Sequence, residues 1–143
     1  MKTLFAASLL APVLAFAQAT PVGVWKTIDD DGKTEKSLVR ISEQGGVLVG
    51  SIDKLLDPKA AADGRCDACT DDRKDKPVLG LQIIRGVKAE GDGVWGGGEI
   101  LDPKNGKTYK TRLKPVDGGK RLEVRGYIGA PLFGRTQTWV RVD

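Results

Sequence analysis

From residue 21 onward the apolar residues occur in short runs, and no long segment repeats them with the period of a helix. Clusters of Gly, Asp and Asn separate these runs, as in Asp30-Asp31-Gly32, Asn105-Gly106 and Asp117-Gly118-Gly119. Such residues tolerate positive φ, which tight hairpin turns require. The sequence therefore predicts an all-β fold in which neighbouring strands pair antiparallel.

The apolar runs predict eight strands, over residues 23–28, 37–42, 47–52, 79–85, 94–101, 108–113, 122–127 and 137–142. In the seventh run Leu122 and Val124 alternate with Arg121, Glu123 and Arg125, as expected of a half-buried strand. Sequential antiparallel strands with one apolar face close most simply into an up-and-down barrel, because closure leaves no open edge. A sandwich of two sheets is the alternative.

Residues 53–77 interrupt this pattern, because they contain scattered apolar residues, two prolines and both cysteines of the chain. Connections of this length are uncommon and are often functional. We expect one long loop excursion from the barrel here. Residues 60–62 are three alanines that suit a helical turn, and residues 78–85 fit either a short helix or a strand.

The first 19 residues have the features of a secretory signal peptide. Lys2 precedes an apolar run over residues 4–16, and small residues follow at Ala15, Ala17 and Ala19. The run is shorter than the roughly 20 apolar residues of a membrane span. We therefore expect a signal peptide over residues 1–19 and one barrel domain over residues 20–143. The product is expected to be periplasmic or secreted, with no integral membrane segment after cleavage.

The chain contains no histidine, which excludes Ser-His-Asp and Cys-His catalysis and imidazole-bound zinc. Glu99 and Asp102 are three positions apart on or near one expected strand, so they face opposite sides and do not form a glycosidase pair. The sequence favours a protein that is not an enzyme, without closing the question. No cofactor or metal is expected. The net charge is +4 with acidic and basic residues interspersed, so nucleic acid is not an expected partner.

Cys66 and Cys69 are the two cysteines and form a C-x-x-C motif. No alternating strand and helix pattern surrounds the motif, as a thioredoxin-like site would need. In an exported chain a local disulfide is the first interpretation. A redox-active pair and one half of a metal site remain alternatives.

Gly23-x-Trp25 on the first expected strand, together with Arg141 on the last, resembles the lipocalin signature, in which a tryptophan closes one barrel end beneath an arginine. Further motifs follow in order: Gly50-x-Ile52, Cys66-x-x-Cys69, Pro77-x-x-Gly80-Leu81, Gly97-Gly98-x-Ile100-Leu101-Asp102-Pro103, Gly106-Lys107-x-Tyr109, Arg125-Gly126-Tyr127-Ile128-Gly129 and Leu132-Phe133-Gly134-Arg135-Thr136-x-x-Trp139. This succession over residues 23–141 resembles the bacterial family named domain of unknown function 2147. The resemblance implies an exported bacterial protein with a lipocalin-like barrel and no established activity or catalytic residue.

An eight-stranded barrel has room for side chains or for one small ligand. We therefore expect a carrier that binds a small, partly apolar ligand, with four aromatic residues lining the site: Trp95, Tyr109, Tyr127 and Phe133. Residues 126–135 are rich in apolar side chains and either plug the barrel end or line its mouth. The alternatives are a thiol-disulfide redox protein that uses the C-x-x-C motif, and an envelope module that contacts a protein partner.

Overall fold

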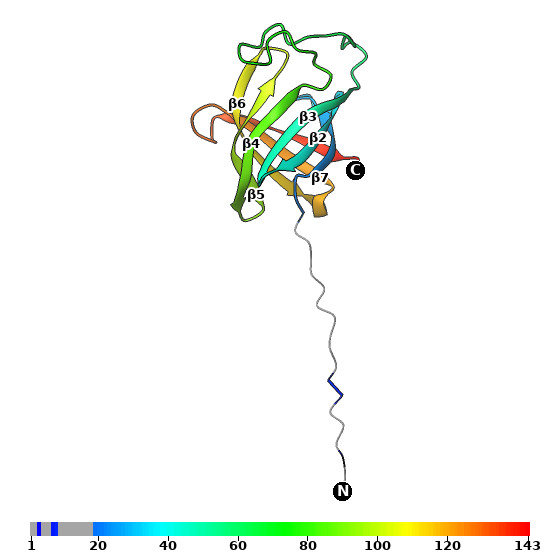
Figure 1. The fold of residues 1–143 in the computed structure, drawn as a ribbon, viewed down its shortest axis with the longest axis vertical. Helices are drawn as coiled ribbons and strands as arrows, with labels where there is room; N and C mark the ends of the chain where they lie inside the picture. The colour runs from blue at the N-terminus through cyan, green and yellow to red at the C-terminus, as the bar shows by residue number, and fades with distance from the viewer. Residues whose placement is uncertain (1–2, 4–6, 9–18) are drawn as a thin grey trace.

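A computed structural model describes residues 3, 7–8 and 19–143 of the chain (Figure 1). Within these residues eight antiparallel strands form one closed barrel, in which each strand pairs with its neighbours in sequence and β1 also pairs with β8. The strands are β1 (Gly23–Ile28), β2 (Glu35–Gln44), β3 (Val47–Leu55), β4 (Gln82–Gly91), β5 (Val94–Asp102), β6 (Lys107–Val116), β7 (Arg121–Tyr127) and β8 (Gly134–Arg141). A 3-10 turn, Asp117–Gly119, joins β6 to β7.

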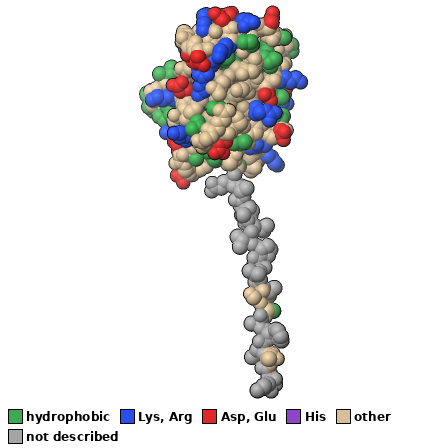
Figure 2. Space-filling model, in the orientation of Figure 1, with side chains coloured by type: hydrophobic (Ala, Val, Ile, Leu, Met, Phe, Trp, Pro, Cys, Tyr) green, Lys and Arg blue, Asp and Glu red, His purple; other side chains and the backbone are tan. Residues whose placement is uncertain are grey.

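The all-β, up-and-down barrel predicted from the sequence is confirmed, and the two-sheet sandwich is wrong. The predicted signal peptide, residues 1–19, lies almost entirely outside the described residues and stays a prediction. No helix among the described residues has the length and apolar character needed to cross a membrane. On the face seen in Figure 2, basic and acidic side chains are interspersed over the barrel.

The largest difference in strand position concerns β4, which begins at Gln82 and not at residue 79. Gly80 has a φ of +85° and donates its N–H to the Ile52 carbonyl, so the chain turns at this point before it pairs with β3. The alternative of a helix over residues 78–85 is therefore wrong. Residues 60–62 form turns, in which the Ala60 N–H bonds the Asp57 carbonyl, and not the helical turn considered from the sequence.

Trp25 and Arg141 close one end of the barrel. The Trp25 side chain is fully buried, and its indole N–H donates to the Pro21 carbonyl at 2.7 Å. The Arg141 guanidinium lies 4.2 Å from the centroid of the Trp25 ring. It also donates at 2.6–2.9 Å to three backbone carbonyls, those of Thr20, Val22 and Gly119. This guanidinium therefore links the segment before β1 to β8 and to the β6–β7 connection.

Gly23 allows this arrangement. Its φ is +143°, and a Cβ on this residue would overlap the Arg141 guanidinium and the Asp143 carbonyl. Only glycine fits a backbone that passes this close to another group with positive φ. The G-x-W motif thus has two separate functions, because its glycine makes room for the arginine and its tryptophan supports it.

The connection between β3 and β4, residues 56–81, is an ordered excursion, green in Figure 1. Its centre is the buried side chain of Arg73, which donates to the Asp71 carboxylate and to the Gln82 carbonyl. A disulfide joins Cys66 to Cys69, and both residues are buried. These contacts fix the excursion against the barrel wall.

Candidate functional site

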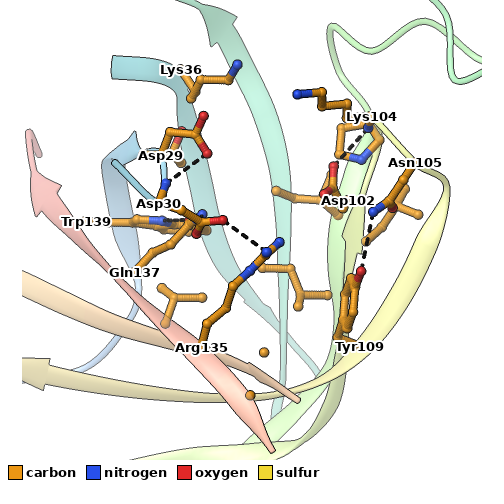
Figure 3. Close-up of a pocket in the computed structure, with 18 of the residues that line it drawn as sticks. Asp29, Asp30, Lys36, Asp102, Lys104, Asn105, Tyr109, Arg135, Gln137 and Trp139 are labelled. Carbon is orange, nitrogen blue, oxygen red and sulfur yellow. Dashed lines mark hydrogen bonds and ion pairs between the residues drawn. The ribbon is translucent and has the colours of Figure 1, made fainter. Parts of the chain in front are cut away.

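The barrel encloses a cavity of about 910 Å³, and Figure 3 shows many of the residues that line it. The cavity opens at the end opposite Trp25 and Arg141. In an up-and-down barrel the odd-numbered strands all end at the same side, so the β1–β2, β5–β6 and β7–β8 connections meet at this mouth. Residues from each of these connections line the cavity. Its apolar lining includes Ile52, Ile83, Ile100, Leu101, Val124 and Trp139.

The rim of the cavity carries charged groups of both signs. The acidic residues are Asp29, Asp30 and Asp102, and the basic residues are Lys36, Lys104 and Arg135. Turn chemistry positions one part of this rim, because the Asp102 carboxylate accepts the Lys104 N–H at 2.9 Å. Asn105 completes the same turn by accepting the N–H of Lys107 at 2.9 Å. The mouth therefore offers fixed hydrogen-bond donors and acceptors around an apolar interior.

A chain of polar contacts runs along one wall from the interior to the rim (Figure 3). The Trp139 indole N–H donates to the Gln137 side-chain oxygen at 3.0 Å. The Gln137 amide donates in turn to the Asp30 carboxylate at 2.9 Å, and Arg135 pairs with the second oxygen of that carboxylate at 3.1 Å. These contacts attach the β1–β2 connection to β8.

Lys36 lies on the far side of the mouth from the β5–β6 turn (Figure 3). It pairs with Asp57 of the excursion at 3.0 Å. The hydrogen bond to the Asp57 carboxylate raises the pKa of Lys36 above its usual value, and the charges of Asp29 and Asp102 raise this pKa further. The raised pKa favours the charged form of Lys36 at the rim.

The sequence comparison places the chain in a family. The family model described as "Uncharacterized protein conserved in bacteria (DUF2147)" matches residues 23–141. The chain belongs to this family. No curated protein sequence matches the chain significantly.

The DUF2147 barrel is similar to a solved structure described as "Protein HP1028 from the human pathogen Helicobacter pylori belongs to the lipocalin family". The TM-score is 0.75 at 20% sequence identity, over 87% of this chain and 84% of that chain. At this identity the similarity concerns the fold, which is a lipocalin-like barrel. The family recognised from the sequence motifs and its lipocalin-like fold are both confirmed.

The four aromatic residues expected at the ligand site have different positions in the DUF2147 structure. Tyr109 lines the cavity, and its hydroxyl accepts a hydrogen bond from the Asn105 amide at 3.3 Å. Phe133 borders the mouth while most of its side chain is exposed. The exposure of Phe133 shows that residues 126–135 border the mouth and do not plug it.

Tyr127 and Trp95 differ in their relation to the cavity. Tyr127 borders the cavity and is buried, and the Arg112 guanidinium lies 5.9 Å from the centroid of its ring. Trp95 pairs with Leu113 near the closed end and packs against the core below the cavity, whose lining does not include it. Trp139, which was not among the four expected residues, also lines the cavity.

Cys66 and Cys69 lie in the excursion and not in the cavity lining. The Cys66 sulfur is 3.8 Å from the carbonyl of Pro103, in the β5–β6 turn. Gly106 of the same turn packs so closely on the carbonyl of Ala68 that a Cβ would overlap it. The disulfide loop thus supports the β5–β6 part of the rim from outside.

Proposed function

We propose that this protein is an exported carrier of the bacterial envelope that holds a small amphiphilic ligand in its barrel. The supporting observation is the cavity of about 910 Å³, which has an apolar interior, a polar rim and one open end. Small-molecule sites commonly have volumes of about 300–1,000 Å³ and combine an apolar lining with a few oriented polar groups. The predicted signal peptide and the disulfide support a location outside the cytoplasm.

The distribution of groups in the cavity favours a particular ligand chemistry. An apolar chain would lie against Ile83, Ile100 and Trp139, which form the interior. A headgroup would meet the rim, where carboxylates and cations alternate, so a zwitterionic or neutral polar group fits better than a multiply charged anion. We therefore propose a single-chain amphiphile, such as a lysophospholipid with an ethanolamine headgroup, as the ligand class.

The structure favours this function over thiol-disulfide exchange. Exchange requires an attacking thiolate to reach a sulfur atom, and both Cys66 and Cys69 are buried within the excursion. Their contact with the β5–β6 turn instead suits a structural disulfide. We assign Cys66 and Cys69 this supporting role.

Tryptophan fluorescence tests the proposed function, because only Trp139 of the three tryptophans lines the cavity. Titration with lysophosphatidylethanolamine should give a saturable change in emission of the unmodified protein. The Trp139→Phe variant should lose most of this change, and the matched Trp95→Phe variant should retain it. An unmodified protein that gives no saturable response to lysophospholipids or fatty acids would overturn the carrier function. A response that depends on Trp95 and not on Trp139 would place the ligand elsewhere.

A further inference from the structure

The β7–β8 loop, residues 128–133, exposes three large apolar side chains at the mouth of the cavity. Ile128, Leu132 and Phe133 are 66%, 80% and 70% exposed. Elsewhere on the described surface, the exposed large hydrophobic residues reach at most 48%. The loop, orange in Figure 1, projects away from the strands. Such a concentration of exposed apolar side chains is a feature of interaction sites.

Polar contacts hold the loop in this shape. The Arg125 guanidinium donates to the carbonyl of Pro131 at 2.7 Å and of Leu132 at 3.4 Å, and to the Thr136 hydroxyl at 2.9 Å. Inside the loop, the Phe133 N–H donates to the Ala130 carbonyl at 2.9 Å. The backbone is thus fixed from within the loop and from β7, and the apolar side chains are not needed to hold it. The exposure of these apolar side chains therefore follows from the fixed conformation of the loop backbone.

The apolar surface of the loop continues into the cavity. Ile128 and Phe133 both line the cavity as well as being exposed, and Val124 and Ile100 lie further inside. Leu132 extends the same surface outward and does not line the cavity. An apolar chain could therefore pass from the loop to the interior along apolar contacts.

We propose that the β7–β8 loop is a membrane-docking element, which inserts Leu132, Phe133 and Ile128 into the surface of a phospholipid bilayer and brings the cavity mouth against it. The shape of the loop favours a bilayer over a protein partner. Stable protein interfaces bury about 800 Å² on each partner, which three side chains on a protruding loop do not supply. A bilayer needs no matching surface, because a protruding apolar group inserts between its lipids. Lys104 on the same rim is a cation that can approach lipid phosphates.

Docking itself does not need a ligand in the cavity, but the delivery of lipid to or from the bilayer rests on the proposed carrier function. Co-sedimentation with vesicles of phosphatidylethanolamine and phosphatidylglycerol tests docking alone. Leu132→Ser should weaken vesicle partitioning by about tenfold or more, since it removes one fully inserted side chain without touching the cavity. The triple variant Ile128→Ser, Leu132→Ser, Phe133→Ser should abolish partitioning. Val142→Ser, at an exposed apolar residue near the closed end, is the matched control and should bind like the unmodified protein.

The docking proposal is overturned if the unmodified protein does not bind vesicles, or if Val142→Ser weakens binding as much as Leu132→Ser does. A concentration-dependent dimer that Leu132→Ser dissociates would assign the loop to a second copy of the chain instead. The Leu132→Ser variant should still bind lysophosphatidylethanolamine in the absence of vesicles. Ligand binding without vesicle binding therefore contradicts docking only, and vesicle binding without ligand binding contradicts the carrier function only.

Discussion

The guanidinium of Arg141 lies over the ring of Trp25, 4.2 Å from its centroid, and this pair closes the barrel end opposite the cavity mouth. Arg141→Lys should lower the free energy of unfolding by about 1–3 kcal/mol, because an ammonium group cannot bond three carbonyls while it stacks on an indole. Urea unfolding monitored by circular dichroism measures the change. Arg121→Lys, at an exposed arginine of β7, is the control and should leave stability unchanged. Equal effects of the two substitutions would contradict the closing role.

Gly106 and Gly93 permit a direct test of the contact between the excursion and the rim. Their φ values are +72° and +73°, but only Gly106 faces another segment, at the carbonyl of Ala68. Gly93→Ala should cost about 1–2 kcal/mol from the left-handed backbone alone. Gly106→Ala should cost about 1–3 kcal/mol more, because the methyl group displaces the disulfide loop. Limited proteolysis should show faster cleavage within residues 56–81 only for Gly106→Ala.

Gly126 offers a way to fill the cavity without disturbing the fold. It lines the cavity, and a Cβ there would meet Tyr109 and Ile100 at 3.6 Å and 3.8 Å, which are ordinary contact distances. Gly126→Leu should keep the stability of the barrel and weaken amphiphile binding by at least about tenfold. Gly126→Ala should have an intermediate effect. Calorimetric titration distinguishes the three proteins, and unchanged affinity in Gly126→Leu would place the ligand outside the cavity.

The ionised carboxylate of Asp71 in the excursion makes the stability of the fold depend on pH in the acid range. Its hydrogen bonds with Arg73 lower its pKa from 3.8 to about 2. A lowered pKa in the folded state stabilises the fold above the unfolded value, and this contribution is lost as the pH falls through the folded value. We therefore expect stability to decrease between about pH 4 and pH 2. Asp71→Asn should be less stable at pH 7 and should show a smaller decrease over that interval, as measured by urea unfolding at several pH values. The neighbouring control Asp63→Asn should follow the unmodified protein.

Removal of the disulfide should affect the excursion and leave the barrel intact. The Cys66→Ser, Cys69→Ser double variant should lose about 2 kcal/mol, because the closed ring is short. Hydrogen exchange should increase in residues 56–81 and stay unchanged in β7 and β8. Faster exchange throughout the barrel would instead show that the disulfide holds the whole fold.

Much of the fold was predictable because the alternation of apolar and polar residues along a strand indicates which of its faces is buried. In β7, Leu122 and Val124 face inward between charged neighbours, and the burial in the structure follows this pattern. The start of β4 was less predictable, because Leu79 and Leu81 are as apolar as strand residues. Their conformation is set by a turn at Gly80, whose N–H donates to the Ile52 carbonyl in β3.

The site was only partly predictable because it depends on the direction in which each side chain points and on the register between paired strands. Trp95 and Trp139 are both strand tryptophans, but Trp95 lies outside the cavity lining at the beginning of β5, while Trp139 of β8 lines the cavity. The spacing of two among Arg135, Gln137 and Trp139 was a usable signal that these side chains share one face. Their partner Asp30 is 107 residues from Gln137, and no local pattern indicates that contact.

The arrangement at Arg141 also determines how the molecule can be handled. Residues 20 and 143 both lie beside this arginine, since its guanidinium bonds the Thr20 carbonyl and the Asp143 carbonyl bonds Val24. A tag, a fusion partner or a sensor surface joined next to residue 20 or residue 143 would therefore lie at the barrel end opposite the cavity mouth. Immobilisation through either of these two positions should leave ligand access and the projecting loop unobstructed.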